Sequence, residues 1–102
     1  MIVVAGSARV RPEKRVEAME LAKRMTEQTR QEAGCRSSGY YVSVESPETF
    51  FLFQVWESEE ALNEHYRQEH VRQFQEKLPE MLAGETAVHF LNRYDVESVM
   101  PL

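Results

Sequence analysis

The sequence predicts one α+β domain whose elements run in the order strand, helix, strand, strand, helix, strand. Three observations predict this class. The chain has 102 residues, its segments change between strand-like and helix-like spacing of apolar residues, and turn-forming residues separate those segments. We expect residues 1–95 to form the domain and residues 96–102 to form a short C-terminal tail.

The first third of the chain predicts a strand followed by a long helix. Residues 2–10 are rich in β-branched and small side chains, which favours a strand. Pro12 suits a first helical turn, and Gly34 suits the residue that ends a helix. Between them, up to residue 33, the chain has the apolar spacing of a helix. The apolar positions of this helix are Val16, Met19, Ala22 and Met25.

The middle of the chain predicts a β-hairpin. In residues 36–45 apolar side chains alternate, which indicates a strand with one buried face. Residues 46–48 are turn-forming. Residues 49–57 are almost continuously apolar, as in a strand that is covered on both faces.

The remaining segments predict two helical pieces and a last strand. Ser58 is a suitable helix N-cap, and acidic residues follow it where the helix dipole favours them. The first piece carries His65, and the second carries Phe74 and is expected to kink or end at Pro79. Residues 85–95 alternate again and predict the final strand.

This order of elements matches the ferredoxin-like split βαβ motif, a four-stranded antiparallel sheet with helices on one face only. The other face would then present tyrosine, phenylalanine and valine side chains to water. Because an apolar face of that size is normally covered, we expect a second copy of the chain to cover it and form a homodimer.

Composition excludes several classes of partner. The formal net charge is −5 and no run of Lys and Arg is present, so nucleic acid and anionic membranes are poor candidates. The single cysteine excludes an internal disulfide and a cysteine-based metal cluster. No stretch has the length of a membrane span or the pattern of a signal peptide, so we expect a cytoplasmic protein.

His65 and Trp56 are the strongest candidates for chemistry. His65 shares a helical face with Ala61 and Leu62, and this face must meet the sheet. Trp56 ends the preceding strand near the start of the same helix. An imidazole in an apolar space beside an indole could bind or deprotonate a flat aromatic molecule. The alternative is that His65 is a hydrogen-bonded core residue and Trp56 a packing residue.

The histidine spacing does not predict a metal site. His70 follows His65 by five residues, whereas two imidazoles on one helical face are four apart. If a break falls at residues 67–69, both histidines could still line one cavity. Arg93, on the last strand, either pairs with a carboxylate or meets a bound oxygen anion.

Together these residues carry a resemblance to a known family. The chain resembles the antibiotic biosynthesis monooxygenase domain family, and within it the small bacterial quinol monooxygenase-like proteins. The similarity runs from Ile2 to about Tyr94. Its carriers are the early Val-Val-Ala strand, Glu-Ala-Gly-Cys at residues 32–35, and Val55-Trp56-Glu57-Ser58 followed by Ala61, Leu62, His65 and His70.

The resemblance implies a dimeric α+β barrel that oxygenates a phenol-type aromatic molecule with dioxygen and uses no flavin, haem or metal. We therefore predict His65 and Trp56 as catalytic residues, with His65 as the base and Trp56 shaping the aromatic slot. The predicted substrate-binding residues are Asn63, His70, Tyr40, Phe74 and Arg93. Haem breakdown is disfavoured, because haem-degrading relatives have a tryptophan where this chain has His65.

Two other functions remain open. One is a non-catalytic binding module that carries or senses an aromatic metabolite. The other is an isomerase of a small phosphorylated metabolite, for which Arg36 and Arg93 are the candidate phosphate ligands.

Overall fold

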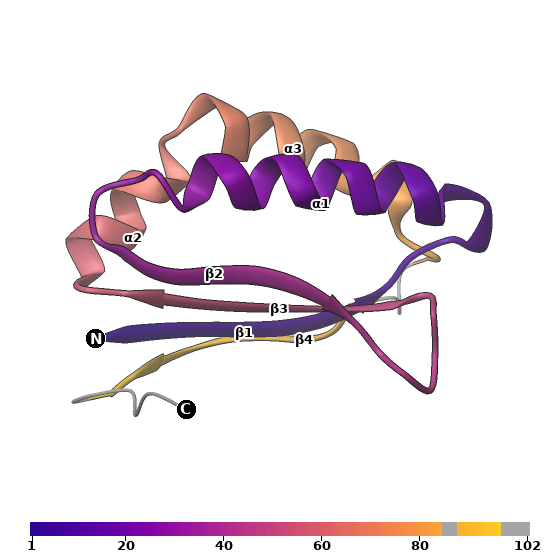
Figure 1. Cartoon of the computed structure of the whole chain (residues 1–102), viewed down its shortest axis with the longest axis horizontal. Coiled ribbons are helices and arrows are strands. Elements are labelled where there is room, and N and C mark those ends of the chain that lie inside the picture. The colour runs from indigo at the N-terminus through magenta and orange to yellow at the C-terminus, as the bar shows by residue number, and fades with distance from the viewer. Residues whose placement is uncertain (85–87, 97–102) are drawn as a thin grey trace.

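The structure, a computed structural model, describes residues 1–84 and 88–96, and for residues 88–91 it describes the backbone only (Figure 1). A short 3-10 turn, Pro12–Lys14, precedes the first helix. The other elements are β1 (Ile2–Arg9), α1 (Arg15–Thr29), β2 (Cys35–Val42), β3 (Thr49–Trp56), α2 (Glu59–Tyr66), α3 (Glu69–Met81) and β4 (Val88–Asp95).

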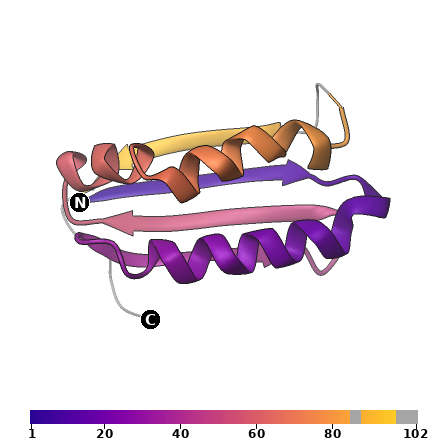
Figure 2. The ribbon, with the colours of Figure 1, turned by 90° about the horizontal axis from the view of Figure 1, so that it is seen from above.

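The four strands form one antiparallel sheet in the order β2-β3-β1-β4. All three helices lie over the same face of this sheet, with α1 above β2 and β3 and with α3 beside it (Figures 1 and 2). The predicted α+β, ferredoxin-like fold is therefore confirmed.

The core beneath the helices is divided into two clusters. At one end of the sheet, Ile2, Val4 and Trp56 pack with Leu62 of α2. At the other end, a second cluster joins the sheet to α1 and α3, and its members are Val10, Ala18, Phe50 and Met81. The clusters lie apart because Ile2 pairs with Trp56 at one end of the β1–β3 ladder, and Ala8 pairs with Phe50 near the other.

Helix α1 is shorter than the sequence predicts. It ends at Thr29, and hydrogen bonds from the amides of Gln31 and Glu32 back to Gln28 and Thr29 form a turn instead of another helical turn. The predicted apolar face is also partly wrong, because Val16 is 68% exposed. The neighbouring row, which includes Ala18, faces the sheet, since small side chains allow the helix to approach it closely.

The second half of the chain follows the prediction with one correction. Ser58 caps α2 as expected, with the amide of Ala61 donating to its Oγ at 3.1 Å. Pro79 does not end α3, which continues to Met81. Pro79 and Gln75 are both exposed, so water can bind the carbonyl whose hydrogen bond the proline removes.

Two predicted segments fall partly outside the described residues. These are the start of the last strand, at residues 85–87, and most of the tail, at residues 97–102. In the part of the chain that the structure describes, no helix is long and apolar enough to cross a membrane.

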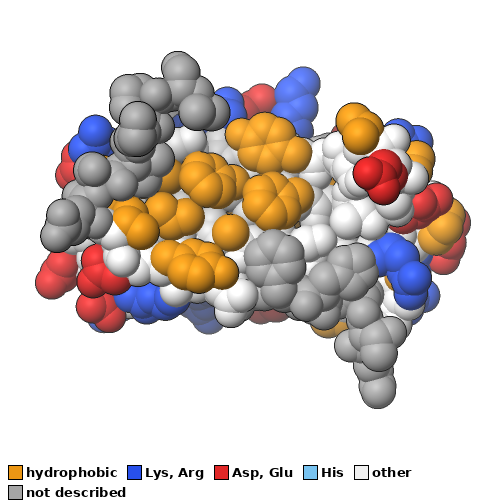
Figure 3. Space-filling view, turned by 90° about the horizontal axis from the view of Figure 1, so that it is seen from below, with side chains coloured by type: hydrophobic (Ala, Val, Ile, Leu, Met, Phe, Trp, Pro, Cys, Tyr) orange, Lys and Arg blue, Asp and Glu red, His pale blue; other side chains and the backbone are white. Residues whose placement is uncertain are grey.

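The sheet face opposite the helices carries a group of apolar side chains (Figure 3). Phe53 pairs with Ala5 of β1 and with Gly39 of β2, and its register places it on this face. Tyr41, on the same face, is 53% exposed, and its hydroxyl lies 2.8 Å from the position that a Cβ of Gly39 would take. The glycine therefore allows the tyrosine ring to lie flat along the strand.

Gly34 closes the turn between α1 and β2, and we expect its replacement to destabilise the fold. Its φ is +84°, and an added Cβ would lie 2.5 Å from the Cβ of Ala61. Gly34→Ala should lower the free energy of unfolding by about 2–5 kcal/mol in urea denaturation, from backbone strain and overlap together. Gly84→Ala is the matched control, because its φ is +118° but nothing lies within 4 Å of the new Cβ. Equal losses in the two variants would contradict the role of the Ala61 contact.

Candidate functional site

A cavity of about 200 Å³ lies between the sheet and the helices. Its position follows from the two core clusters, because Gly6 and Ala8 lie in the stretch of β1 between them and fill little space. Helix α1 contributes another small side chain, Ala18, to the lining. An engineered apolar cavity of about 150 Å³ binds benzene, so this one has room for a molecule with a single aromatic ring.

The lining is mostly apolar, with a few polar groups. The exposed Gln75 and Lys77 belong to it, so the cavity reaches the surface beside α3. The apolar residues of the lining include Leu21, Ala22, Met25, Phe50, Leu52, Val71, Phe74, Leu78 and Met81. The polar residues farther inside are Gln54, His65 and Tyr40, and the exposed Tyr66 lies at the rim.

His65 projects from α2 into the space between helices and sheet. It is only 2% exposed, yet it lines the cavity. Its position is set by Leu62 one turn earlier, which is fully buried in the core and fixes the face of α2 that meets the sheet. The sequence-based expectation that His65 faces an open space is therefore met by the structure.

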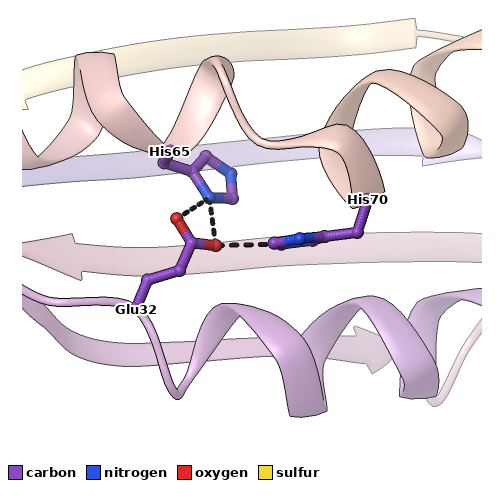
Figure 4. A group of neighbouring side chains, drawn as sticks. All are labelled: Glu32, His65 and His70. Carbon is purple, nitrogen blue, oxygen red and sulfur yellow. Dashed lines mark hydrogen bonds and ion pairs between the residues drawn. The ribbon is translucent and has the colours of Figure 1, made fainter.

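Glu32 holds the imidazole of His65 in a defined orientation (Figure 4). The Nδ1 atom of His65 lies 2.9 Å from Oε2 and 3.2 Å from Oε1 of this carboxylate. Because an ionised carboxylate can only accept hydrogen bonds, Nδ1 must carry the proton and donate it. Glu32 does not line the cavity, so Nε2, with its lone pair, is the nitrogen available to a molecule bound there.

Burial and the carboxylate have opposite effects on the pKa of His65. Burial is the larger effect and lowers the pKa, because the charged imidazolium loses contact with water. The hydrogen bond and negative charge of Glu32 raise the pKa, and His70 lowers it slightly. The net shift is downward, so the ring is neutral near pH 7 and can accept a proton.

Trp56 packs against the ring of His65 and does not line the cavity. It is fully buried in the first core cluster, and its ring centroid lies 4.7 Å from that of His65. Its Nε1 donates to Oε1 of Gln54 at 3.1 Å. These contacts indicate that Trp56 positions the imidazole of His65. They do not support the predicted role of Trp56 in shaping the aromatic slot.

Gln54 is a polar cavity residue that the sequence analysis missed. It is 3% exposed and lies on the helix-facing side of β3. Because its carbonyl oxygen accepts from Trp56, its amide nitrogen is directed away from the indole and can donate to a ligand. Because residues 49–57 are almost continuously apolar, their spacing gives no signal that Gln54 faces the cavity.

Tyr40 and Phe74, both predicted to bind substrate, form one aromatic wall of the cavity. Their ring centroids lie 5.9 Å apart at an angle of 46°. Burial raises the pKa of the Tyr40 phenol well above its usual value. Tyr40 is therefore a neutral hydroxyl at neutral pH, not an anion.

Three other predicted residues lie outside the cavity lining. Asn63 is exposed on α2. Arg93 pairs with Glu59 at 3.2 Å, the structural alternative that the sequence left open. His70 lies in the first turn of α3, after the break at residues 67 and 68, and its Nε2 lies 2.9 Å from Oε2 of Glu32.

Glu32 is therefore the residue that joins the two histidines. Sequence reasoning used it only as part of the family resemblance and gave it no functional role. It lies in the turn after α1, where the prediction had a continuous helix. The break between α2 and α3 allows both imidazoles to reach it. Donor atoms of all three residues lie within 4.8 Å of one another, a grouping that could hold a metal ion.

Comparison with known proteins identifies the family. The sequence model of the family described as antibiotic biosynthesis monooxygenase matches residues 1–77. This chain belongs to that family. The match contains Glu32, His65 and His70, and most of the cavity lining.

Individual relatives agree with this assignment to the antibiotic biosynthesis monooxygenase family. An uncharacterised protein of Synechocystis sp. is 37% identical over 82 residues, which are 80% of this chain and 56% of that protein, so this chain spans little more than half of that relative. YcnE of Bacillus subtilis, provisionally named a monooxygenase, is 30% identical over 84 residues, which are 82% of this chain and 88% of YcnE. A conserved Methanosarcina mazei Go1 protein of known structure is 34% identical, with a TM-score of 0.83. The superposition covers 91% of this chain and 89% of that protein.

For this member of the antibiotic biosynthesis monooxygenase family, we expect Glu32→Gln to weaken the fold as well as the site. A glutamine offers one acceptor oxygen and no negative charge to two imidazole donors. The free energy of unfolding in urea should fall by about 1–3 kcal/mol. Glu20→Gln is the control, because Glu20 is an exposed carboxylate on α1 and its loss should change stability by less than about 0.5 kcal/mol. Equal effects would show that the Glu32 contacts contribute nothing.

Proposed function

We propose that the protein is a cofactor-independent monooxygenase that oxidises a single-ring hydroquinone or related phenol with dioxygen. The observation that carries the proposal is the Glu32–His65 pair at the edge of the cavity. A carboxylate that accepts from Nδ1 leaves Nε2 as a proton acceptor, the arrangement by which many hydrolases orient a histidine base. Membership of the antibiotic biosynthesis monooxygenase family supports the reaction class.

The proposed reaction begins when Nε2 of His65 takes the phenolic proton. The amide nitrogen of Gln54 donates to the oxygen that becomes negatively charged. The phenolate passes one electron to dioxygen, and the resulting phenoxyl radical and superoxide combine at a ring carbon. The peroxide then takes a proton and loses water as the ring becomes a quinone. For hydroquinone, one oxygen atom enters the ring as hydroxyquinone and the other leaves as water, so the substrate supplies all electrons.

The size and polarity of the cavity support this substrate class. About 200 Å³ suits one aromatic ring, and the wall of Tyr40 and Phe74 offers the edges and faces that such a ring contacts. The phosphorylated substrate of an isomerase is less suitable. Arg93 pairs with Glu59, and Lys77 is the only Lys or Arg among the described lining residues.

We also propose that two copies of the chain associate through the open sheet face. The apolar side chains on this face include Phe53 and the exposed Tyr41 (Figure 3). A domain of this size gains stability when such a face is removed from water. Association through this face would give the dimeric α+β barrel that the sequence analysis expected.

Oxygen uptake measures the reaction directly. Protein freed of metal and flavin should consume oxygen with hydroquinone above the rate of autoxidation, and form one hydroxyquinone per dioxygen. His65→Gln should lower this rate by about 10²–10⁴-fold, because the base is lost while the cavity stays similar in volume. Circular dichroism checks that the variant is folded.

Uptake that is unchanged in His65→Gln would remove His65 from the mechanism. No uptake over autoxidation, together with saturable quenching of Trp56 fluorescence by hydroquinone and recovery of the unchanged ligand, would favour the binding module instead. Trp56 is a clean reporter because it is the only tryptophan and touches His65.

For the assembly, sedimentation equilibrium should give about twice the chain mass of 11.9 kDa. Phe53→Glu should shift the protein towards monomer, because it places a charge on the apolar face. Glu60→Gln, an exposed change on α2 away from this face, is the control. A wild-type monomer at micromolar concentration would contradict the proposed dimer.

A further inference from the structure

The three residues joined by Glu32 come from three separate segments. Glu32 lies in the turn after α1, His65 on α2 and His70 in the first turn of α3 (Figure 4). Their side chains are 12%, 3% and 17% exposed. One oxygen, Oε2, lies 2.9 Å from a nitrogen of each imidazole. The fold thus directs two nitrogen donors and a carboxylate to one place.

Imidazoles contact the carboxylate of Glu32 at the positions where a Lys or Arg would pair with it. Within residues 1–84 and 88–96, no Lys or Arg forms an ion pair with Glu32, and its two ion-pair contacts are both with histidines. A carboxylate that is largely removed from water is costly unless a positive charge or strong hydrogen bonds compensate it. Hydrogen bonds from the two imidazoles already compensate part of this cost, and a bound cation would add a positive charge.

The donor set is one that divalent transition metals use. A carboxylate and two imidazoles hold zinc in several hydrolases and iron in non-haem oxygenases. A tetrahedral zinc ion with bonds of about 2.0–2.2 Å holds its donors roughly 3.3–3.6 Å apart. Here the donor atoms lie within 4.8 Å of one another, and the shortest separations are 2.9 Å. Side-chain shifts of about 1 Å would therefore accommodate the ion.

The surface beside the cluster leaves room for a further ligand. A second hollow, between the end of α1 and α2, is lined by Glu32 and His70 together with Gln28, Glu64 and Gln68. This hollow does not include His65, which lines the central cavity on its other side. A metal ion would thus be reached from solvent, and it would not occupy the space for the aromatic ring.

We propose that Glu32, His65 and His70 form a binding site for a divalent transition metal, and that metal binding switches off the base. Coordination through Nδ1 of His65 requires the proton to move to Nε2, because a neutral imidazole carries one proton and one lone pair. The nitrogen that faces the cavity then donates instead of accepting. The inhibitory part of this proposal rests on the proposed function, and the binding part does not.

Binding is tested on untagged protein stripped of metal with a chelator and then titrated with zinc chloride. Calorimetry and elemental analysis should give one zinc per chain. His70→Gln should weaken the affinity by at least about 100-fold, since it removes a ligand. His89→Gln removes the remaining histidine of the chain and should leave binding unchanged. No stoichiometric binding, or equal losses in both variants, would overturn the site.

A spectroscopic measurement on the wild type covers the case in which His70→Gln fails to fold. Nitrogen NMR of the histidine rings should show Nδ1 of His65 and Nε2 of His70 changing on zinc addition, with the Nε2 of His65 becoming protonated. Zinc that binds without altering either of these nitrogens would overturn the proposed ligands.

The inhibitory part is tested by oxygen uptake with hydroquinone. In the wild type, oxygen uptake should fall in proportion to zinc occupancy. At the same zinc concentration, His70→Gln should keep most of its own metal-free rate of uptake. Uptake that rises with occupancy would overturn the switch. Stoichiometric zinc binding with no uptake in any state would instead refute the proposed function and leave the metal site standing.

Discussion

The carboxylate of Glu32 is the group on which the rest of the site depends. It accepts hydrogen bonds from imidazoles on two different helices, so it links the end of α1 to α2 and α3 across the top of the sheet. The same contact decides which nitrogen of His65 carries the proton, and therefore whether the buried ring can act as a base. Structural support and chemistry are thus properties of one interaction, which makes the two hard to change separately.

The cavity is a consequence of how the core is divided. When helices cover one face of a sheet, large side chains normally fill the space between the two layers along its whole length. Here two clusters fill the ends, and Gly6 and Ala8 leave the middle open. The chain gives up burial and contact energy there, and a small domain has little to spare. The proposed association through the open sheet face would offset that loss.

The sequence predicted the sheet, the hairpin and the place of His65. Each depends on local periodicity and on turn-forming residues, which can be recognised from the sequence alone. It could not predict the partner of His65. Glu32 is 33 positions away in sequence, and its contact requires α1 to end early, Gly34 to adopt a positive φ and the chain to break after Tyr66. Gln54 was hidden for a related reason, since a single polar residue within an apolar strand shows its role only when its neighbours are known. Trp56 was placed correctly next to His65, but its burial behind the ring followed from packing that no spacing rule describes.

The central claim is that Glu32 fixes the tautomer of His65. The most direct measurement is the long-range proton–nitrogen correlation spectrum of ¹⁵N-histidine-labelled, metal-free protein, with His70→Gln and His89→Gln used to assign the ring of His65 by elimination. If Glu32 fixes the tautomer, His65 is neutral, with the proton on Nδ1 and an unprotonated Nε2. A ring protonated on Nε2 alone, or a free mixture of the two tautomers as in an exposed histidine, would contradict it.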